Sequence, residues 1–244
     1  MKIVIDLGHG VGTDRGAVGI ISEETIINEV GYLVINKLKV LGHTVIEVRP
    51  TAATSVGNSL AQRTEKANTN NVDLYVSIHA NAGGGKGTEV FTYNAKEVTQ
   101  ARAVLSNLVA LGFTNRGIKD GSNLYVVKNP SAISILIEVC FVDTQSDVDL
   151  YNSIGAENIA NAIVNGLTGQ TVSTNNKKYY VVTNYLPKDA DGYLDISYAL
   201  SFFNGVKCYL KSDSKGIWVE TQYLSLEECN KLKEVLGSWF YDIR

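Results

Sequence analysis

The sequence predicts a three-layer α/β domain with a largely parallel, twisted sheet flanked by helices, followed by a small α+β domain. Through residues 1–168, apolar runs of strand length alternate with amphipathic helical stretches, which is typical of a parallel sheet covered by helices. A polar, helix-averse stretch at 169–176 indicates a linker. Beyond it lie both tryptophans and eight of the thirteen tyrosines, so residues 177–244 form a second domain of different composition.

Each element of the first domain follows from a local pattern. The first strand ends in a glycine-dense segment, and Ser22 is a suitable N-cap for the first helix, whose apolar residues recur at spacings of three and four. Residues 73–79 are apolar enough for a strand buried on both faces. The expected strands are 2–6, 44–48, 73–79, 88–93, 124–127 and 132–142, and the expected helices are 22–41, 59–70, 97–111 and 145–167.

The second domain is predicted to have the element order βαββαβ, with a tight hairpin loop at 212–216. This is the order of a split βαβ, ferredoxin-like unit. The expected strands are 179–186, 206–211, 217–223 and 239–243, and the expected helices are 196–203 and 226–236. A unit of about 70 residues is marginal alone, and an exposed sheet edge can pair two protomers, so we expect a possible homodimer through this domain.

Composition narrows the function classes. The net charge of −3 provides no large basic surface for nucleic acid or anionic lipid. No run approaches the about 20 apolar residues of a membrane helix. The three cysteines are odd in number and lack CxxC spacing, as expected for reduced thiols. A strand begins at once after Met1, so we expect synthesis in the cytoplasm without a signal peptide.

Two histidines follow strands that can be neighbours. His9 leaves the carboxyl end of the first strand and His79 that of the strand at 73–79, and ligand crevices of open α/β sheets lie at this edge. Glu138 lies near the carboxyl end of a third strand and can reach the same place. His43 precedes its strand and belongs to the opposite edge. Two imidazoles and a carboxylate are a typical catalytic zinc set with one open position.

The spacing leaves the third ligand open among Glu23, Glu24, Glu29 and Glu138. The first two also fit the start of a helix, where the helix dipole favours acids, and a lone histidine after a strand is more often a turn residue than a ligand. Glu138 differs, because a carboxylate inside the run ILIEVCF has no evident partner and is costly to bury. Buried acids of this kind gather at active sites.

Four stretches in order resemble the zinc-dependent N-acetylmuramoyl-L-alanine amidases of cell-wall lysis over residues 1–168. They are DLGHGVGTDRGAVG, Glu24 with Asn28 four residues on, VSIHANA and ILIEVCFVD. The resemblance implies that His9, Glu24 and His79 bind Zn²⁺ and that Glu138 is the catalytic acid. Two positions depart from the family pattern, since proline is usual where Leu7 stands and glycine is common at Cys140.

By this resemblance, the chain hydrolyses the amide between N-acetylmuramic acid and L-alanine in peptidoglycan of a Gram-positive-type wall. A phage endolysin released through holin pores fits, and so does a mother-cell sporulation autolysin. A zinc carboxypeptidase and a non-catalytic glycan-binding protein are the alternatives. Asn81 is the expected substrate-binding residue, although an Asx turn explains it equally well.

The second domain is expected to bind the cell wall. It resembles SPOR-like modules and the terminal domains of clostridial phage endolysins in element order only. From Asn175 onward it has nine Lys/Arg and nine Asp/Glu, so simple attraction to anionic wall polymers cannot be its main mechanism. Its tyrosines and tryptophans can stack on sugar rings, or simply form the core of a small sheet domain.

Overall fold

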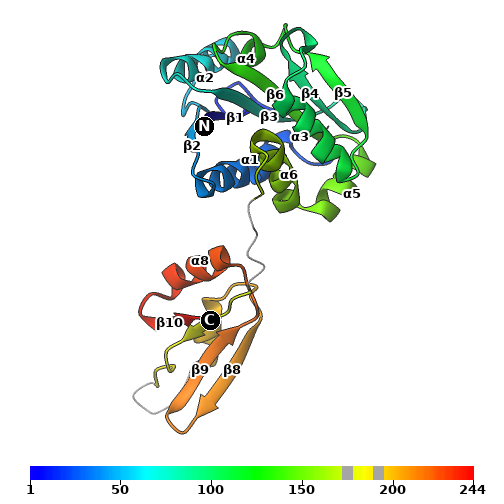
Figure 1. Cartoon of the computed structure of the whole chain (residues 1–244). Coiled ribbons are helices and arrows are strands. Elements are labelled where there is room, and N and C mark those ends of the chain that lie inside the picture. The colour runs from blue at the N-terminus through cyan, green and yellow to red at the C-terminus, as the bar shows by residue number, and fades with distance from the viewer. Residues whose placement is uncertain (172–177, 189–194) are drawn as a thin grey trace. The chain divides into compact units, whose positions relative to one another are not determined.

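A computed structural model describes residues 1–171, 178–188 and 195–244 of the chain. The chain divides into two compact units, residues 1–172 and 173–244 (Figure 1). The expected linker at 169–176 lies mostly outside the described residues. Among the residues that are described, no helix combines the length and apolar character needed to cross a membrane.

The first unit contains a six-stranded sheet in its described part, in the order β2-β1-β3-β6-β4-β5. The first four strands in this order are parallel, whereas β4 runs antiparallel to β6 and parallel to β5. The predicted largely parallel sheet is therefore confirmed. The strands are β1 (Lys2–Leu7), β2 (Thr44–Glu47), β3 (Leu74–Asn81), β4 (Thr88–Thr92), β5 (Asn115–Asp120) and β6 (Ile133–Phe141).

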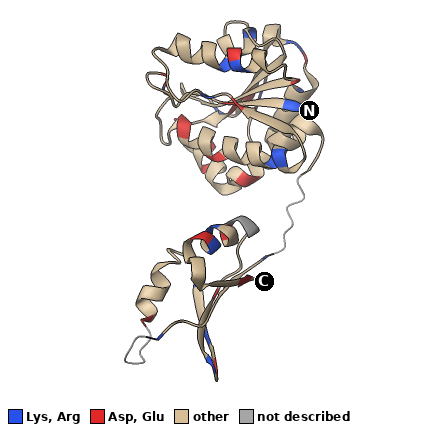
Figure 2. Ribbon diagram, turned by 90° about the vertical axis from the view of Figure 1, so that its left-hand side faces the viewer, with Lys and Arg blue, Asp and Glu red and all other residues tan. Residues whose placement is uncertain are grey.

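Helices cover both faces of this sheet, as Figure 2 shows. One core joins α1, α3 and α6 to alternate residues of β1, β3 and β6, and a second core on the other face joins α2 and α4 to the remaining ones. The helices are α1 (Glu23–Val40), α2 (Val56–Thr69), α3 (Thr99–Ala110), α4 (Tyr125–Lys128), α5 (Gln145–Ile154) and α6 (Ala156–Thr168), with a 3₁₀ turn η1 (Tyr93–Ala95). Ser22 caps α1 as predicted, because its side chain accepts from the backbone N–H of Thr25.

Two predicted elements of the first unit are wrong. The expected strand at 124–127 is the short helix α4, whose Val126 and Val127 are buried; a short apolar run fits either structure. The edge strand is instead β5, a polar segment without the alternation that marks strands. The single helix expected at 145–167 is divided into α5 and α6, because Gly155 has a φ of +78° and breaks the helix.

The second unit has a four-stranded antiparallel sheet in its described part, in the order β10-β7-β9-β8. Two helices pack on one face of it around a core that includes Val181, Phe203 and Val219. Its elements are β7 (Val181–Thr183), α7 (Ile196–Ser201), β8 (Cys208–Asp213), β9 (Gly216–Thr221), α8 (Leu226–Leu236), η2 (Gly237–Trp239) and β10 (Phe240–Ile243).

Candidate metal centre

The sequence-predicted residues converge at one edge of the first unit's sheet. β1, β3 and β6 are parallel neighbours, so their carboxyl ends meet there. His9 follows β1, His79 lies in β3, and Glu138 in β6 stands opposite His79 in the strand register. His43 lies elsewhere, where its ring contacts the amino terminus of the chain.

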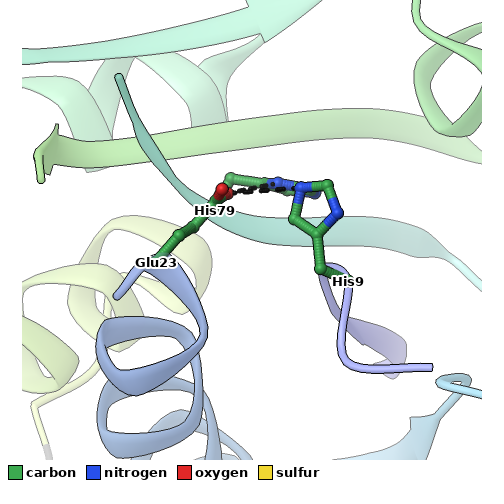
Figure 3. A group of neighbouring side chains, drawn as sticks. All are labelled: His9, Glu23 and His79. Carbon is green, nitrogen blue, oxygen red and sulfur yellow. Dashed lines mark hydrogen bonds and ion pairs between the residues drawn. The ribbon is translucent and has the colours of Figure 1, made fainter. Parts of the chain in front are cut away.

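Figure 3 shows two imidazoles and one carboxylate facing a common point. The Oε1 atom of Glu23 lies 3.0 Å from Nδ1 of His79 and 3.4 Å from Nε2 of His9. The two rings meet edge to face, with centroids 4.8 Å apart. Ligands bound tetrahedrally to zinc at about 2.0–2.1 Å lie about 3.3 Å from one another. All three candidate ligand atoms lie within 4.8 Å of one another, so the donor set and its spacing fit Zn²⁺.

The carboxylate at this point belongs to Glu23, whereas the family resemblance implied Glu24. Glu24 instead accepts hydrogen bonds from the side chain of Arg15 at 2.8 Å and from the backbone N–H of Gly16 at 3.2 Å. The helix phase explains the difference: Glu23 precedes the buried Ile26 and Ile27 by three and four residues, so it shares their inward face. Glu24 is turned about 100° away from that face.

Asn28 and Glu29, which were considered together with Glu24 from the sequence, make contacts outside the cluster. Asn28, the second residue of the motif, accepts a hydrogen bond from Arg49 at 2.8 Å. Glu29, the third glutamate left open by the spacing, accepts from the hydroxyl of Tyr151. Neither residue belongs to the cluster of candidate ligands, which within the described part of the chain comprises His9, Glu23 and His79.

The tight turn after β1 carries His9 and packs against the ring of His79. His9 has a φ of +53°, in the left-handed region that is uncommon for residues other than glycine. A Cβ at Gly8 would lie 2.4 Å from Cε1 and Nε2 of His79, so only glycine allows this ring to pack there. Leu7, where the family usually has proline, is accommodated in a similar way, because its Cδ2 fills the space that a side chain on Gly31 would occupy.

A buried polar network holds His9 from behind. Its Nδ1 lies 2.8 Å from Oδ1 of Asp14, and the second oxygen of Asp14 accepts from the hydroxyl of Ser59 at 2.7 Å. A carboxylate on the far nitrogen is the usual means of fixing the tautomer and orientation of a metal-binding histidine. Arg63, which is 1% exposed, donates to the backbone oxygen of His9 at 2.8 Å and also to Asp6.

The groups of the cluster shift the pKa values of His9 and Glu23 in opposite directions. Burial alone lowers the pKa of His9, but hydrogen bonds and charges from Glu23 and Asp14 outweigh burial and raise it above its ordinary value. Burial alone raises the pKa of Glu23, but the two imidazoles lower it far below the usual range of a carboxyl group. The carboxylate therefore remains ionised and available as a ligand.

Glu138 is a second acid of opposite character. Its Oε2 atom is buried and has no hydrogen-bond partner among the described residues. Burial raises the pKa of Glu138 well above its ordinary value, and the negative charges of Glu23 and Glu89 raise it further. For its Oε2 atom, the prediction that this carboxylate lacks a local partner is confirmed. An isolated acid beside a candidate metal set is positioned for proton transfer.

Asn81 lies at the same edge, but its side chain is engaged. Its Nδ2 donates to Oε1 of the buried Glu89 at 2.8 Å, and its Oδ1 accepts from the backbone N–H of Ala82. Glu89 stands opposite Glu138 in the register and also accepts from Nε of Arg116 at 2.9 Å.

Sequence reasoning missed four residues around the centre, namely Asp14, Arg63, Glu89 and Arg116. Arg63 alone had a local signal, because it is a charged residue on the inward face of a helix. The contacts of Asp14 with Ser59 and of Arg116 with Glu89 join distant segments.

The first unit is a candidate metal-dependent hydrolase, because one edge of its α/β sheet carries two histidines, a carboxylate and an isolated acid. The profile of the family described as N-acetylmuramoyl-L-alanine amidase matches residues 3–169. The chain belongs to this family. The matched region ends at the last helix of the first unit.

Individual relatives agree with the family. The sporulation-specific N-acetylmuramoyl-L-alanine amidase of Bacillus subtilis is 32% identical over 68% of this chain and 67% of its own length. An uncharacterized protein of Clostridium perfringens is 33% identical over 72% of this chain, and the match spans 54% of that relative. The solved catalytic domain of the CD27L endolysin targeting Clostridia difficile superposes with a TM-score of 0.64 at 28% identity, covering 71% of this chain and 99% of that domain.

Proposed function

We propose that the first unit hydrolyses the amide bond between N-acetylmuramic acid and L-alanine in peptidoglycan, with His9, Glu23 and His79 as zinc ligands. The observation that carries this proposal is the His9–Glu23–His79 cluster beside an unpartnered Glu138 in a member of the amidase family. When bound, Zn²⁺ lowers the pKa of a ligated water and polarises the amide carbonyl.

The protein's own residues then have distinct tasks. Glu138 accepts the proton of the attacking water and returns it to the departing alanine nitrogen as the C–N bond breaks. Burial raises the pKa of Glu138, which makes its carboxylate a stronger proton acceptor. Asp14 holds the His9 ring so that Nε2 faces Glu23.

Metal analysis combined with mass spectrometry of digested sacculi tests this function. The purified protein should contain about one zinc per chain, as a three-ligand catalytic site binds a single ion, and the digest should contain new L-alanine amino termini. Glu138→Gln should retain the metal and lose about 10²–10⁴-fold in turnover. Release of C-terminal D-alanine alone would indicate a carboxypeptidase, and a metal-free protein that leaves walls intact would indicate a glycan-binding role.

We further propose that the chain consists of a catalytic domain (1–168), a linker (169–176) and a ferredoxin- or SPOR-like wall-binding domain (177–244). The support is a cavity of about 330 Å³ lined by Tyr185, Trp218, Tyr241, Lys215 and Arg244, among others. The ring of Tyr185 lies edge to face with Trp218, with centroids 5.8 Å apart. Aromatic rings with polar ends are suited to stacking on sugar rings. Trp218→Ala should weaken binding of the whole protein to purified walls without changing its zinc content.

The biological setting that we propose is cell lysis by a phage endolysin, with sporulation as the second candidate. Relatives of both kinds support the pair, one solved structure being an endolysin domain and one relative a sporulation-specific amidase. The strands β8 and β10 form the two edges of the second sheet, and we propose that one of them pairs two protomers. Light scattering of the purified chain tests the dimer.

A further inference from the structure

The row of functional side chains continues past Glu138 along the same sheet edge. β4 lies next to β6 and β5 next to β4, as the labels in Figure 1 show. Glu89 in β4 stands opposite Glu138, and Arg116 lies near the start of β5, which is parallel to β4. The sheet edge that carries the candidate metal centre therefore carries a guanidinium at its far end.

Arg116 is held in one orientation by two contacts. Its Nε donates to Oε2 of Glu89 at 2.9 Å, and Glu89 is only 4% exposed. Its guanidinium lies over the ring of Phe141, 4.8 Å from the centroid. Stacking on an aromatic face and an anchored Nε fix the plane of the group before any ligand arrives, which reduces the entropy lost on binding.

The outer donors of this guanidinium remain unused. Neither Nη atom has a hydrogen-bond partner in the part of the chain that the structure describes, and the side chain is 34% exposed. A planar fork of N–H donors is matched in geometry by a carboxylate, which accepts two parallel hydrogen bonds. A neutral carboxamide offers one acceptor oxygen and no charge, so it is a poorer ligand for the fork.

Given the proposed amidase function, on which this inference rests, we propose that Arg116 forms a substrate subsite for a carboxylate of the stem peptide. The nearest candidate is the free α-carboxylate of the D-glutamate that follows L-alanine. It lies about 6 Å from the cleaved nitrogen by standard backbone dimensions. Adjacent strands are about 4.8 Å apart. The guanidinium of Arg116 leans from β5 towards Glu89 in β4. It therefore lies one to two strand spacings, about 5–10 Å, from β6, which carries Glu138.

The subsite makes the enzyme sensitive to amidation of its substrate. Two forms of this substrate differ only in whether the α-group of D-glutamate is a carboxylate or a carboxamide. The amidated substrate cannot form the hydrogen-bonded charge pair with Arg116. Its kcat/KM should therefore be about 10- to 100-fold lower than that of the free acid. Arg116 is a specificity residue in this proposal, because it touches the substrate but not the reacting atoms.

The test uses the full-length, zinc-loaded protein and glycan chains with L-Ala-γ-D-Glu-L-Lys stems, in which the D-glutamate α-group is either free or amidated. The unaltered protein should prefer the free acid by about 10- to 100-fold. Arg116→Gln should remove most of this preference, and Arg116→Lys, which keeps a charge but lacks the fork, should retain part of it. The matched control is Arg102→Gln, because Arg102 also donates its Nε to a glutamate, at 2.8 Å, but on the exposed surface of α3.

The ratio between the two substrates separates recognition from structural damage. Loss of the Glu89 partner alone changes the surroundings of Glu138 and lowers the rate on both substrates by the same factor. Equal rates of the unaltered protein on both substrates, or an unchanged ratio in Arg116→Gln, would overturn the subsite. Release of no L-alanine amino termini from either substrate by the unaltered protein would instead overturn the amidase function, and the subsite with it.

Discussion

Replacing Arg63 by methionine should destabilise the first unit and loosen the support of His9. The guanidinium is 1% exposed and donates to Asp6, to the backbone oxygens of Leu7 and His9, and to the network around Asp14. Methionine fills a similar volume but leaves two buried carboxylates without their cation. Removing one partner of a buried ion pair costs about 3–5 kcal/mol.

This cost is large enough to measure in the whole chain. For a unit of 172 residues, each kcal/mol lowers the melting temperature by about 2–4 °C, so Arg63→Met should lower it by about 6–20 °C. Far-UV circular dichroism of the helix-rich first unit follows the transition. Adding Asp6→Asn should recover about 1–3 kcal/mol, because it neutralises one stranded carboxylate.

The control is Arg102→Met, which removes an exposed pair with Glu97 and should cost less than about 1 kcal/mol. A loss below about 1 kcal/mol for Arg63→Met as well would refute the reasoning. The buried ion pairs of Arg63 would then contribute no more to the free energy of unfolding than an exposed ion pair does.

Three further predictions concern the centre and the second unit. Asp14→Asn should weaken zinc binding by about 10- to 100-fold, measured by chelator competition. Gly8→Ala should displace the His79 ring, since the new Cβ would lie 2.4 Å from it, and zinc content should fall. Ser225→Ala should destabilise the second unit by about 1 kcal/mol in urea unfolding. The hydrogen bonds of Ser225 lower the pKa of Glu228 from 4.5, so this unit should also lose stability as pH falls below about 4.5 and Glu228 becomes protonated.

Controls for these variants are available in the same chain. Gly57→Ala adds a methyl group in α2 that meets nothing nearer than 4.0 Å, so it should leave zinc content unchanged. Asp143→Asn changes an exposed acid that accepts from Gly83 and Gly84, and it should not alter zinc affinity. Equal losses in the controls and in the centre variants would contradict the proposed roles of Asp14 and Gly8.

The positions of His9, His79 and Glu138 could be predicted because each follows an apolar strand or lies near its carboxyl end. Parallel strands bring their carboxyl ends together, so short-range patterns sufficed to locate the site. The choice between Glu23 and Glu24 needed the helix phase. The apolar stripe of α1, extended back to its first residue, selects Glu23, which the structure places beside the two histidines. The likeness of Glu24 and Asn28 to a family motif selected Glu24, which lies outside that cluster.

Other parts of the structure had no adequate local signal. β5 is polar because it is an edge strand, so its pairing with β4 depends on the sheet already being formed. The contact of Asp14 with Ser59 spans 45 residues, and that of Arg116 with Glu89 spans 27. Such contacts are set by topology and cannot be read from residue spacing.

The most direct test of the metal centre is the zinc content of Glu23→Ala and Glu24→Ala, purified side by side with the unaltered protein. Glu23→Ala should lose the ion, while Glu24→Ala, which removes only the contacts with Arg15 and Gly16, should keep about one per chain. Retention of zinc by Glu23→Ala together with its loss from Glu24→Ala would contradict the assignment of the ligands.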